Sequence, residues 1–151
     1  MKRVILALGL VCLVAAVAFA QGKTNFSGTW TPEQAAAAAG GGGGGRGPGG
    51  PITITQTEKE LTVERTMGEN VIKTVYKLDG TESVNESARG GKSTSVCKWD
   101  GAKLLITTKS EGPNGPMEVT QTWFLKDAST MVQERPGQGG NVRTTVYTKG
   151  K

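Results

Sequence analysis

The chain has 151 residues, and its 18 Lys and Arg against 13 Asp and Glu give a formal charge of +5. The charge is small and no basic cluster stands out, so nucleic-acid binding is not expected. Histidine is absent, which removes the commonest general base, the commonest metal ligand and any serine–histidine triad. We therefore expect no enzymatic activity, no bound metal and no cofactor.

Residues 1–20 have the pattern of a secretory signal peptide. Lys2 and Arg3 precede the apolar run Val4–Phe19, and Ala18-Phe19-Ala20 fits the small-x-small cleavage pattern. The run is shorter than the ~20 residues of a membrane-spanning helix, which favours cleavage over an uncleaved anchor. We expect the mature chain to begin at Gln21, to have no transmembrane segment, and to reside in the periplasm or outside the cell.

The mature chain has the length of one domain, residues 21–151. The first expected strand, Phe26–Thr31, contains the motif Gly28-Thr29-Trp30. Residues 35–51 then read "AAAAAGGGGGGRGPGGP", where six consecutive glycines offer no side chains to bury and are entropically costly to order. We predict a flexible flap or linker there, within a single domain.

From Ile52 onward, short segments rich in Thr, Val and Ile alternate with turn signals, a pattern typical of β-strands. The dipeptide Asp79-Gly80 predicts a type I′ hairpin turn, and Asp100-Gly101 predicts another hairpin turn. The expected strands are Ile52–Thr57, Leu61–Thr66, Val71–Leu78, Thr81–Ser87, Ser93–Trp99, Lys103–Ser110, Met117–Leu125, Thr130–Arg135 and Asn141–Lys149.

About ten strands joined by tight turns indicate an antiparallel meander, because parallel strands need crossover connections of a dozen or more residues. Thr81–Ser87 is polar and suits an edge. An open sheet of this size would expose two edges, so the sequence favours closure into an all-β, up-and-down barrel. A β-sandwich is the alternative.

Only Cys97 remains after removal of a leader that contains Cys12, so the mature chain has no internal disulfide. Because Cys97 falls within a strand pattern, we expect it to be buried; pairing with another chain is the alternative.

Loss of Lys2 and Arg3 with the leader lowers the formal charge from +5 to +3. We expect a monomer.

Many strand positions are polar. These residues either line a partly hydrated cavity or form the outer face of the sheet, and the pattern favours neither. For a cavity, the predicted ligand-binding residues are those that alternate with Val75, Lys98, Thr122 and Phe124 along their strands. They are Tyr76, Trp99, Gln121 and Trp123.

Several motifs together resemble the calycin superfamily of lipocalins and fatty-acid-binding proteins. They are "GTW" in the first strand, a following segment of low strand character, "WDG" at Trp99-Asp100-Gly101, and "VRTTVYTK" in the last strand. The chain is most similar to short exported bacterial lipocalin-like proteins. The resemblance implies that Trp30 closes one barrel end beneath Arg143.

Fatty-acid-binding proteins commonly hold a ligand carboxylate with an Arg-x-Tyr in the last strand. Here Thr145 stands two residues before Tyr147, and Arg143 lies two positions further back, where it could still share a face with Tyr147. Taken as a whole, the resemblance implies an exported binding protein for a small apolar or amphipathic molecule. The alternative is a structural or protein-interaction β-domain without a small-molecule ligand.

Overall fold

The structure is a computed structural model that describes residues 23–33, 50–67, 69–86, 91–112 and 115–150. The predicted signal peptide, and the predicted flap apart from Gly50 and Pro51, lie outside these residues. Ten strands are present: β1 Gly28–Pro32, β2 Ile52–Gln56, β3 Glu60–Met67, β4 Asn70–Lys77, β5 Ser83–Glu86, β6 Lys92–Asp100, β7 Lys103–Gly112, β8 Gly115–Asp127, β9 Thr130–Pro136 and β10 Val142–Lys149. A short 3-10 helix, η1 (Gln138–Gly140), joins β9 to β10.

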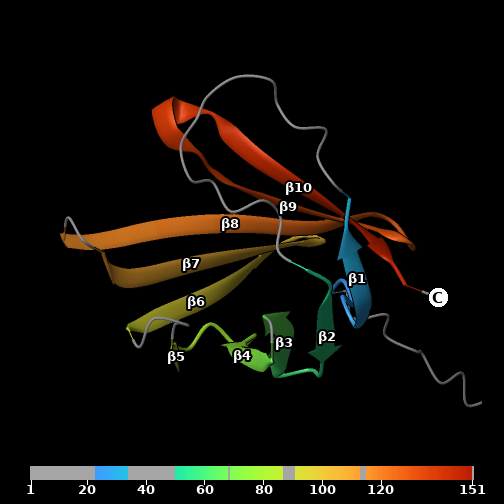
Figure 1. Cartoon of the computed structure of the whole chain (residues 1–151), viewed down its shortest axis with the longest axis horizontal. Coiled ribbons are helices and arrows are strands. Elements are labelled where there is room, and N and C mark those ends of the chain that lie inside the picture. Colours follow the sequence, from blue (N-terminus) through green and yellow to red (C-terminus); the bar gives the residue numbers. More distant parts are fainter. Residues whose placement is uncertain (1–22, 34–49, 68, 87–90, 113–114, 151) are drawn as a thin grey trace, which may run out of the picture.

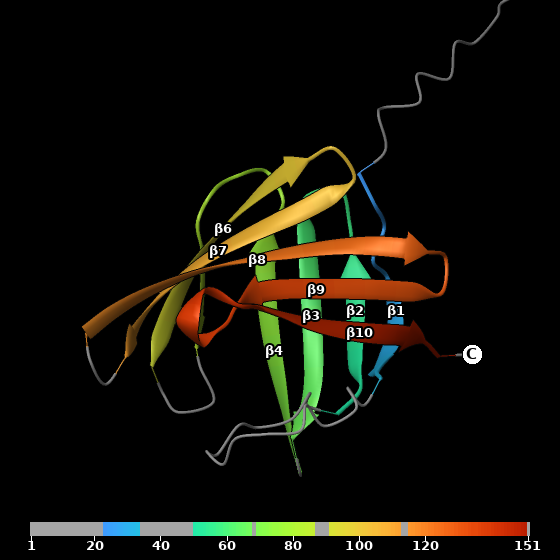
Figure 2. The ribbon, with the colours of Figure 1, turned by 90° about the horizontal axis from the view of Figure 1, so that it is seen from above.

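The ten strands form one antiparallel sheet in the order β4-β3-β2-β1-β10-β9-β8-β7-β6-β5. The sheet curls so that β8–β10 cross over β1–β4, and the two ends of the order approach each other (Figures 1 and 2). The prediction of an all-β antiparallel barrel of about ten strands is thus confirmed. No helix among the described residues is long and apolar enough to cross a membrane.

Strict alternation of apolar and polar residues explains which face of β2 turns inward, and β3 follows the same rule. In β2, Ile52 and Ile54 are buried whereas Thr53 and Thr55 are exposed. In β3, Leu61 is buried in the same way. Because side chains alternate across a strand, this pattern places an apolar face inside the barrel and a polar face outside.

The closed end of the barrel is built around Trp30, which is fully buried. Its indole Nε1 donates a hydrogen bond of 2.8 Å to the carbonyl oxygen of Phe26. Phe26 lies just before β1, not in it as predicted, and its segment is fixed by Gln56. The Gln56 amide accepts from the Phe26 N–H and donates to the Thr24 carbonyl, both at 2.9 Å.

Gly28 explains why this end needs the motif Gly28-Thr29-Trp30. Its φ of +142° is rarely adopted by other residues, and a Cβ there would lie 2.6 Å from Cε of Lys149. The backbone conformation is what requires glycine, because the end of the flexible Lys149 side chain could move away from a Cβ. The core around Trp30 consists of buried side chains from most strands: Ile52, Ile54, Leu61, Val63, Leu78, Cys97, Leu104, Ile106, Trp123, Met131 and Tyr147.

The predicted hairpin at Asp79-Gly80 is wrong, because β4 and β5 are the two ends of the sheet and share no ladder. Side chains of β5 bridge the seam instead. Asn85 accepts from the Val75 N–H at 2.8 Å and donates to the Val75 carbonyl at 2.9 Å, while Ser83 accepts from the Lys77 N–H at 2.7 Å. The barrel is therefore closed by side chains at this seam.

The two Asp-Gly turns are not type I′, which requires positive φ at both central residues. Gly80 and Gly101 have φ of +86° and +58°, but no residue other than glycine in the described part of the chain has positive φ. In the β6–β7 hairpin, Asp100 pairs with Lys103. Gly101 is consequently the first central residue, the position that favours glycine in a type II′ turn.

Candidate binding site

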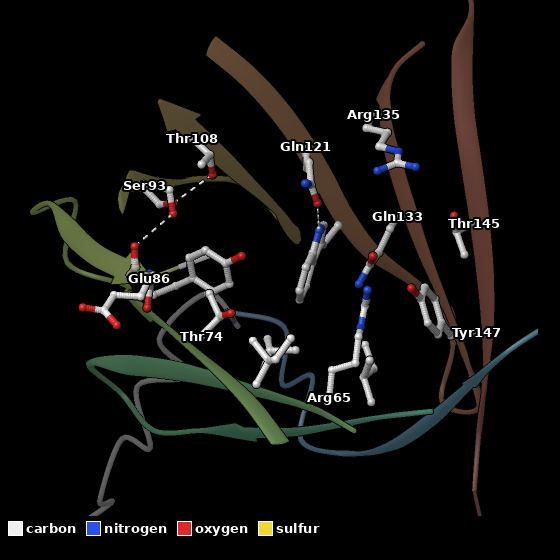
Figure 3. Close-up of a pocket in the computed structure, with 17 residues that line it drawn as sticks. Arg65, Thr74, Glu86, Ser93, Thr108, Gln121, Gln133, Arg135, Thr145 and Tyr147 are labelled. Carbon is white, nitrogen blue, oxygen red and sulfur yellow. Dashed lines mark hydrogen bonds between the residues drawn. The ribbon is translucent and has the colours of Figure 1, made fainter. Parts of the chain in front are cut away.

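A cavity of about 410 Å³ lies inside the barrel, lined by residues from every strand except β1. Its volume equals that of about fourteen water molecules at ~30 Å³ each, and falls within the ~300–1,000 Å³ typical of small-molecule sites. Apolar side chains lie beside many polar ones in its wall. Figure 3 shows the polar residues converging on one space from opposite strands.

Of the four residues predicted to bind a ligand, the structure places Tyr76, Gln121 and Trp123 on the cavity wall. Trp99 is not among the lining residues. Its ring stacks on Phe26, with centroids 6.3 Å apart and planes at 14°, in the core below the cavity. The alternation along β6 indicated that Trp99 faces inward, but not how deep in the barrel it lies.

Trp123 separates the core from the cavity. It contacts Phe26 on one side and Tyr76 on the other in edge-to-face geometry, each at a centroid distance of 6.2 Å. Its indole Nε1 donates to Oε1 of Gln121 at 3.2 Å. The indole is therefore held by contacts within the protein, and the small part of it that stays accessible, 4%, forms an apolar piece of the cavity floor.

Both tyrosines of the cavity wall are held in the protonated form. Burial, with a smaller contribution from the nearby Cys97 thiolate and an opposing one from Arg65, raises the pKa of Tyr76 to about 12. Burial also raises the pKa of Tyr147, while the positive charges of Arg65 and Arg135, and a hydrogen bond with the Arg65 side chain, lower it. At neutral pH both phenols are consequently neutral hydroxyls that can donate hydrogen bonds.

Two arginines bring positive charge to one side of the cavity. Arg65 of β3 is half-buried, and Arg135 of β9 lies at the more exposed mouth. Within the described ranges, the one ion pair joins Lys109 and Glu118 on the outer surface at 3.4 Å, so neither arginine has a carboxylate partner there. A guanidinium that faces a cavity without a carboxylate partner favours a negatively charged ligand group.

A second group of donors faces Arg65. Nε2 of Gln133 is buried and has no hydrogen-bond partner among the residues described. Figure 3 shows Gln133 and Arg65 pointing toward one another beside Tyr147. Because these groups all carry N–H or O–H donors, an acceptor between them would satisfy several donors at once.

The prediction that Arg143 covers Trp30 is wrong. Trp30 pairs with Lys149 across β1 and β10, and Nζ of Lys149 stands 5.4 Å from the centre of the indole ring. Arg143 is exposed at the other end of β10, directly opposite Arg135 of β9. Like charges at opposed positions repel each other, so an anion at this rim would stabilise the pair.

Sequence reasoning missed Arg65, Arg135 and Gln133. A signal was present, because Arg65 alternates with Leu61 and Val63 along β3 and therefore shares their inward face. Arg135 and Gln133 likewise share the face of Met131, which is buried. A charged residue that continues an apolar, inward-facing series is a better indicator of a cavity than aromatic residues alone.

Comparison with solved structures supports the same architecture. The chain is similar to a fatty acid transporter, REP1-NXSQ, with a TM-score of 0.58 and 17% identity over 83% of this chain and 96% of that one. It is also similar to a mutant of the fluorescent protein UnaG, with a TM-score of 0.59 and 23% identity over 83% of this chain and 96% of that one. At these identities the likeness establishes a calycin-like barrel fold.

No protein-family model matches the chain, and no curated protein sequence matches it. The fold is thus known from structural similarity, whereas the ligand has to be inferred from the cavity of this chain.

Proposed function

We propose that this chain is an exported, lipocalin-like binding protein that holds a small amphipathic acid in its barrel cavity. The observation that carries the proposal is the cavity itself, where Arg65 and Arg135 face the interior without carboxylate partners in the described residues. The acid group binds between these guanidinium groups and the donors of Gln133 and Tyr147. The less polar part of the ligand packs on Trp123.

The protein acts by binding rather than by catalysis. Its cavity combines an apolar floor with a small number of convergent donors, the usual composition of a small-molecule binding site. The similarity in fold to a protein described as a fatty acid transporter supports this assignment. The acid site proposed here uses β3 and β9, since Thr145 occupies the last-strand position that carries an arginine in fatty-acid-binding proteins.

Titration with a fluorescent fatty-acid analogue tests the proposal. The analogue should gain intensity, quench tryptophan emission through Trp123 and be displaced by unlabelled decanoic acid. Replacing both arginines, Arg65→Gln with Arg135→Gln, should weaken binding roughly a hundredfold or more, because hydrogen bonds to charged groups contribute ~1.5–3 kcal/mol each. Thermal unfolding of the same variant should remain cooperative.

Lys98→Gln is the matched control, because Lys98 is exposed on the outer face of β6 and its loss removes one positive charge away from the cavity. Binding should be unchanged in this variant. The proposal fails if no acid displaces the analogue, or if the double arginine variant binds as tightly as the unchanged protein.

Export is part of the same proposal and has its own test. The mature protein isolated from the culture or periplasm should begin at Gln21 by intact mass. A soluble product that retains residues 1–20 would contradict export by a cleaved signal peptide.

A further inference from the structure

One region of the barrel has the opposite polarity from the rest. In β5 and the first half of β6, the residues facing the interior are polar, and Ser83, Asn85 and Ser95 are all buried. The residues facing solvent include valine: Val84 is 66% exposed and Val96 is 37% exposed. A sheet that covers an apolar core has the reverse arrangement.

A shifted register does not account for this reversal. Farther along β6, the same inward face carries Cys97, which is buried, and Trp99, which packs on the core. A shift of one residue would expose both of these side chains, since it exchanges the two faces of a strand. The polar face of β5 and β6 is therefore the cavity wall, and the apolar continuation of β6 is the core.

The hydroxyl groups of this wall keep hydrogen-bonding capacity toward the cavity. Ser95 Oγ and Thr108 Oγ1 lie 2.8 Å apart and share one hydrogen bond, and Ser93 Oγ donates to the Asn85 carbonyl oxygen at 3.4 Å. Each hydroxyl has one donor and two acceptor positions, so the Ser95–Thr108 pair retains one donor and further acceptor positions. Ser93, Ser95 and Thr108 are named here the hydroxyl wall.

The hydroxyl wall and the arginines stand on opposite sides of the cavity. Figure 3 shows Ser93 and Thr108 on one side, and Arg65 and Arg135 on the other. An alkyl chain reaching the hydroxyl wall would displace water without replacing its hydrogen bonds, which is unfavourable. A ligand with oxygen atoms at that end would restore them.

We infer that the ligand is an organic acid that carries a hydroxyl or carbonyl oxygen at the end remote from its acid group. This inference rests on the proposed function, because it assumes that the acid group binds at Arg65 and Arg135. The remote oxygen hydrogen-bonds to Ser95 and Thr108. A plain fatty acid of the same length lacks this interaction.

Competition against the fluorescent analogue tests the inference with three compounds of equal chain length: decanoic acid, ω-hydroxydecanoic acid and decanol. The hydroxy acid should bind roughly threefold to tenfold more tightly than decanoic acid, as expected for one additional satisfied hydrogen bond. Decanol should bind most weakly. Ser95→Ala with Thr108→Val should abolish the preference for the hydroxy acid and leave the affinity for decanoic acid nearly unchanged.

The chain offers a matched control for this double variant. Thr107 and Thr120 form the same kind of hydroxyl pair, 2.9 Å apart, at positions that alternate with the cavity-lining Thr108 and Gln121 and therefore face outward. Thr107→Val with Thr120→Val should preserve the preference for the hydroxy acid. Both double variants replace a hydroxyl pair with apolar groups of similar size, so both should fold.

The outcomes separate this inference from the proposed function. If decanoic acid binds as tightly as the hydroxy acid, or if the preference survives in Ser95→Ala with Thr108→Val, the inference is overturned and the proposed function stands. If neither acid displaces the analogue, the proposed function fails, and the inference fails with it.

Discussion

At the scale of single residues, Trp30 is the side chain on which the closed end of the barrel depends most. It is fully buried, hydrogen-bonded to Phe26 and covered on one side by Lys149. Trp30→Ala should lower the free energy of unfolding by about 3–5 kcal/mol, because a large cavity replaces a buried aromatic side chain. Urea denaturation measures this loss.

Replacing either of two cationic residues of β10 provides a comparison for the stability loss in Trp30→Ala. Lys149→Ala should cost about 1 kcal/mol or less, the value of an exposed cation–π contact. Arg143→Ala should cost still less, because Arg143 is exposed at the far end of β10. A Trp30→Ala variant as stable as the parent protein, or a larger loss for Arg143→Ala than for Lys149→Ala, would contradict this account of the closed end.

Protonation of buried residues gives a prediction for alkaline pH. Burial raises the pKa of the Cys97 thiol from 9.0 to about 11. Below pH 9 the thiol is protonated in the folded and unfolded states, so its contribution to stability is constant. Between about pH 9 and pH 11 the unfolded thiol loses its proton while the folded one keeps it, and unfolding becomes more favourable.

The urea midpoint should therefore fall as pH rises through this window, and burial of Tyr76 should extend the fall toward pH 12. Cys97→Val removes the thiol while keeping the site apolar, so its midpoint should fall less steeply. A midpoint that stays level or rises in the unchanged protein, or an equally steep fall in Cys97→Val, would show that the buried thiol is not responsible.

Residue-level prediction from the sequence succeeded where alternation was sufficient. Trp123 and Tyr76 face inward because they alternate with outward-facing neighbours along their strands, and alternation also places Trp99 inward. Alternation does not tell how deep in the barrel a residue lies. That depth is what places Trp99 in the core and the other two residues on the cavity wall. Nor does alternation give register between distant strands, which decides that Lys149 and not Arg143 covers Trp30.

At the scale of elements, the seam between β4 and β5 distinguishes this barrel from a fully hydrogen-bonded one. Asn85 satisfies both the N–H and the carbonyl of Val75, as a neighbouring strand would. Ser83 satisfies only the N–H of Lys77. Closure at this seam thus depends on a few side chains of one short strand.

Asn85→Ala should destabilise the barrel by about 1–3 kcal/mol, because it leaves two partly buried backbone groups of Val75 without partners. Amide hydrogen exchange should become faster at Val75 and change less at Lys77, which Ser83 still holds. Val84→Thr is the control, since Val84 is exposed on the same strand and its replacement should change stability by less than ~0.5 kcal/mol. If the Val75 amide exchanges equally fast in Asn85→Ala and in the parent protein, Asn85 does not close the seam between β4 and β5.

The seam also shows where prediction of elements from sequence ends. All ten strands could be predicted from alternation and turn signals, because these depend on neighbouring residues. The Asp79-Gly80 dipeptide predicted a hairpin, yet the strands on either side of it pair elsewhere. Which strands pair is decided by the closure of the whole sheet, and the bridging role of Asn85 becomes visible only in three dimensions.

At the scale of the whole molecule, the barrel divides into an apolar closed end and a polar cavity. Core residues gather around Trp30 and Trp123, whereas Arg65, Arg135 and the hydroxyl wall surround the cavity. The sequence left open whether its polar strand residues formed an outer face or a cavity. The structure assigns them to both, with the hydroxyl wall inside and residues such as Thr53 and Thr55 outside.

The central claim is that an acid binds inside this barrel, at Arg65 and Arg135, and an NMR titration tests it most directly. Backbone amide spectra recorded during addition of decanoic acid report where the acid binds, with decanol as the uncharged comparison. We predict saturable shifts concentrated at the inward-facing residues of β3, β9 and β10, including Arg65, Gln133 and Tyr147, and much weaker shifts with decanol. Shifts confined to outward-facing residues, equal shifts with decanol, or none at all would contradict the claim.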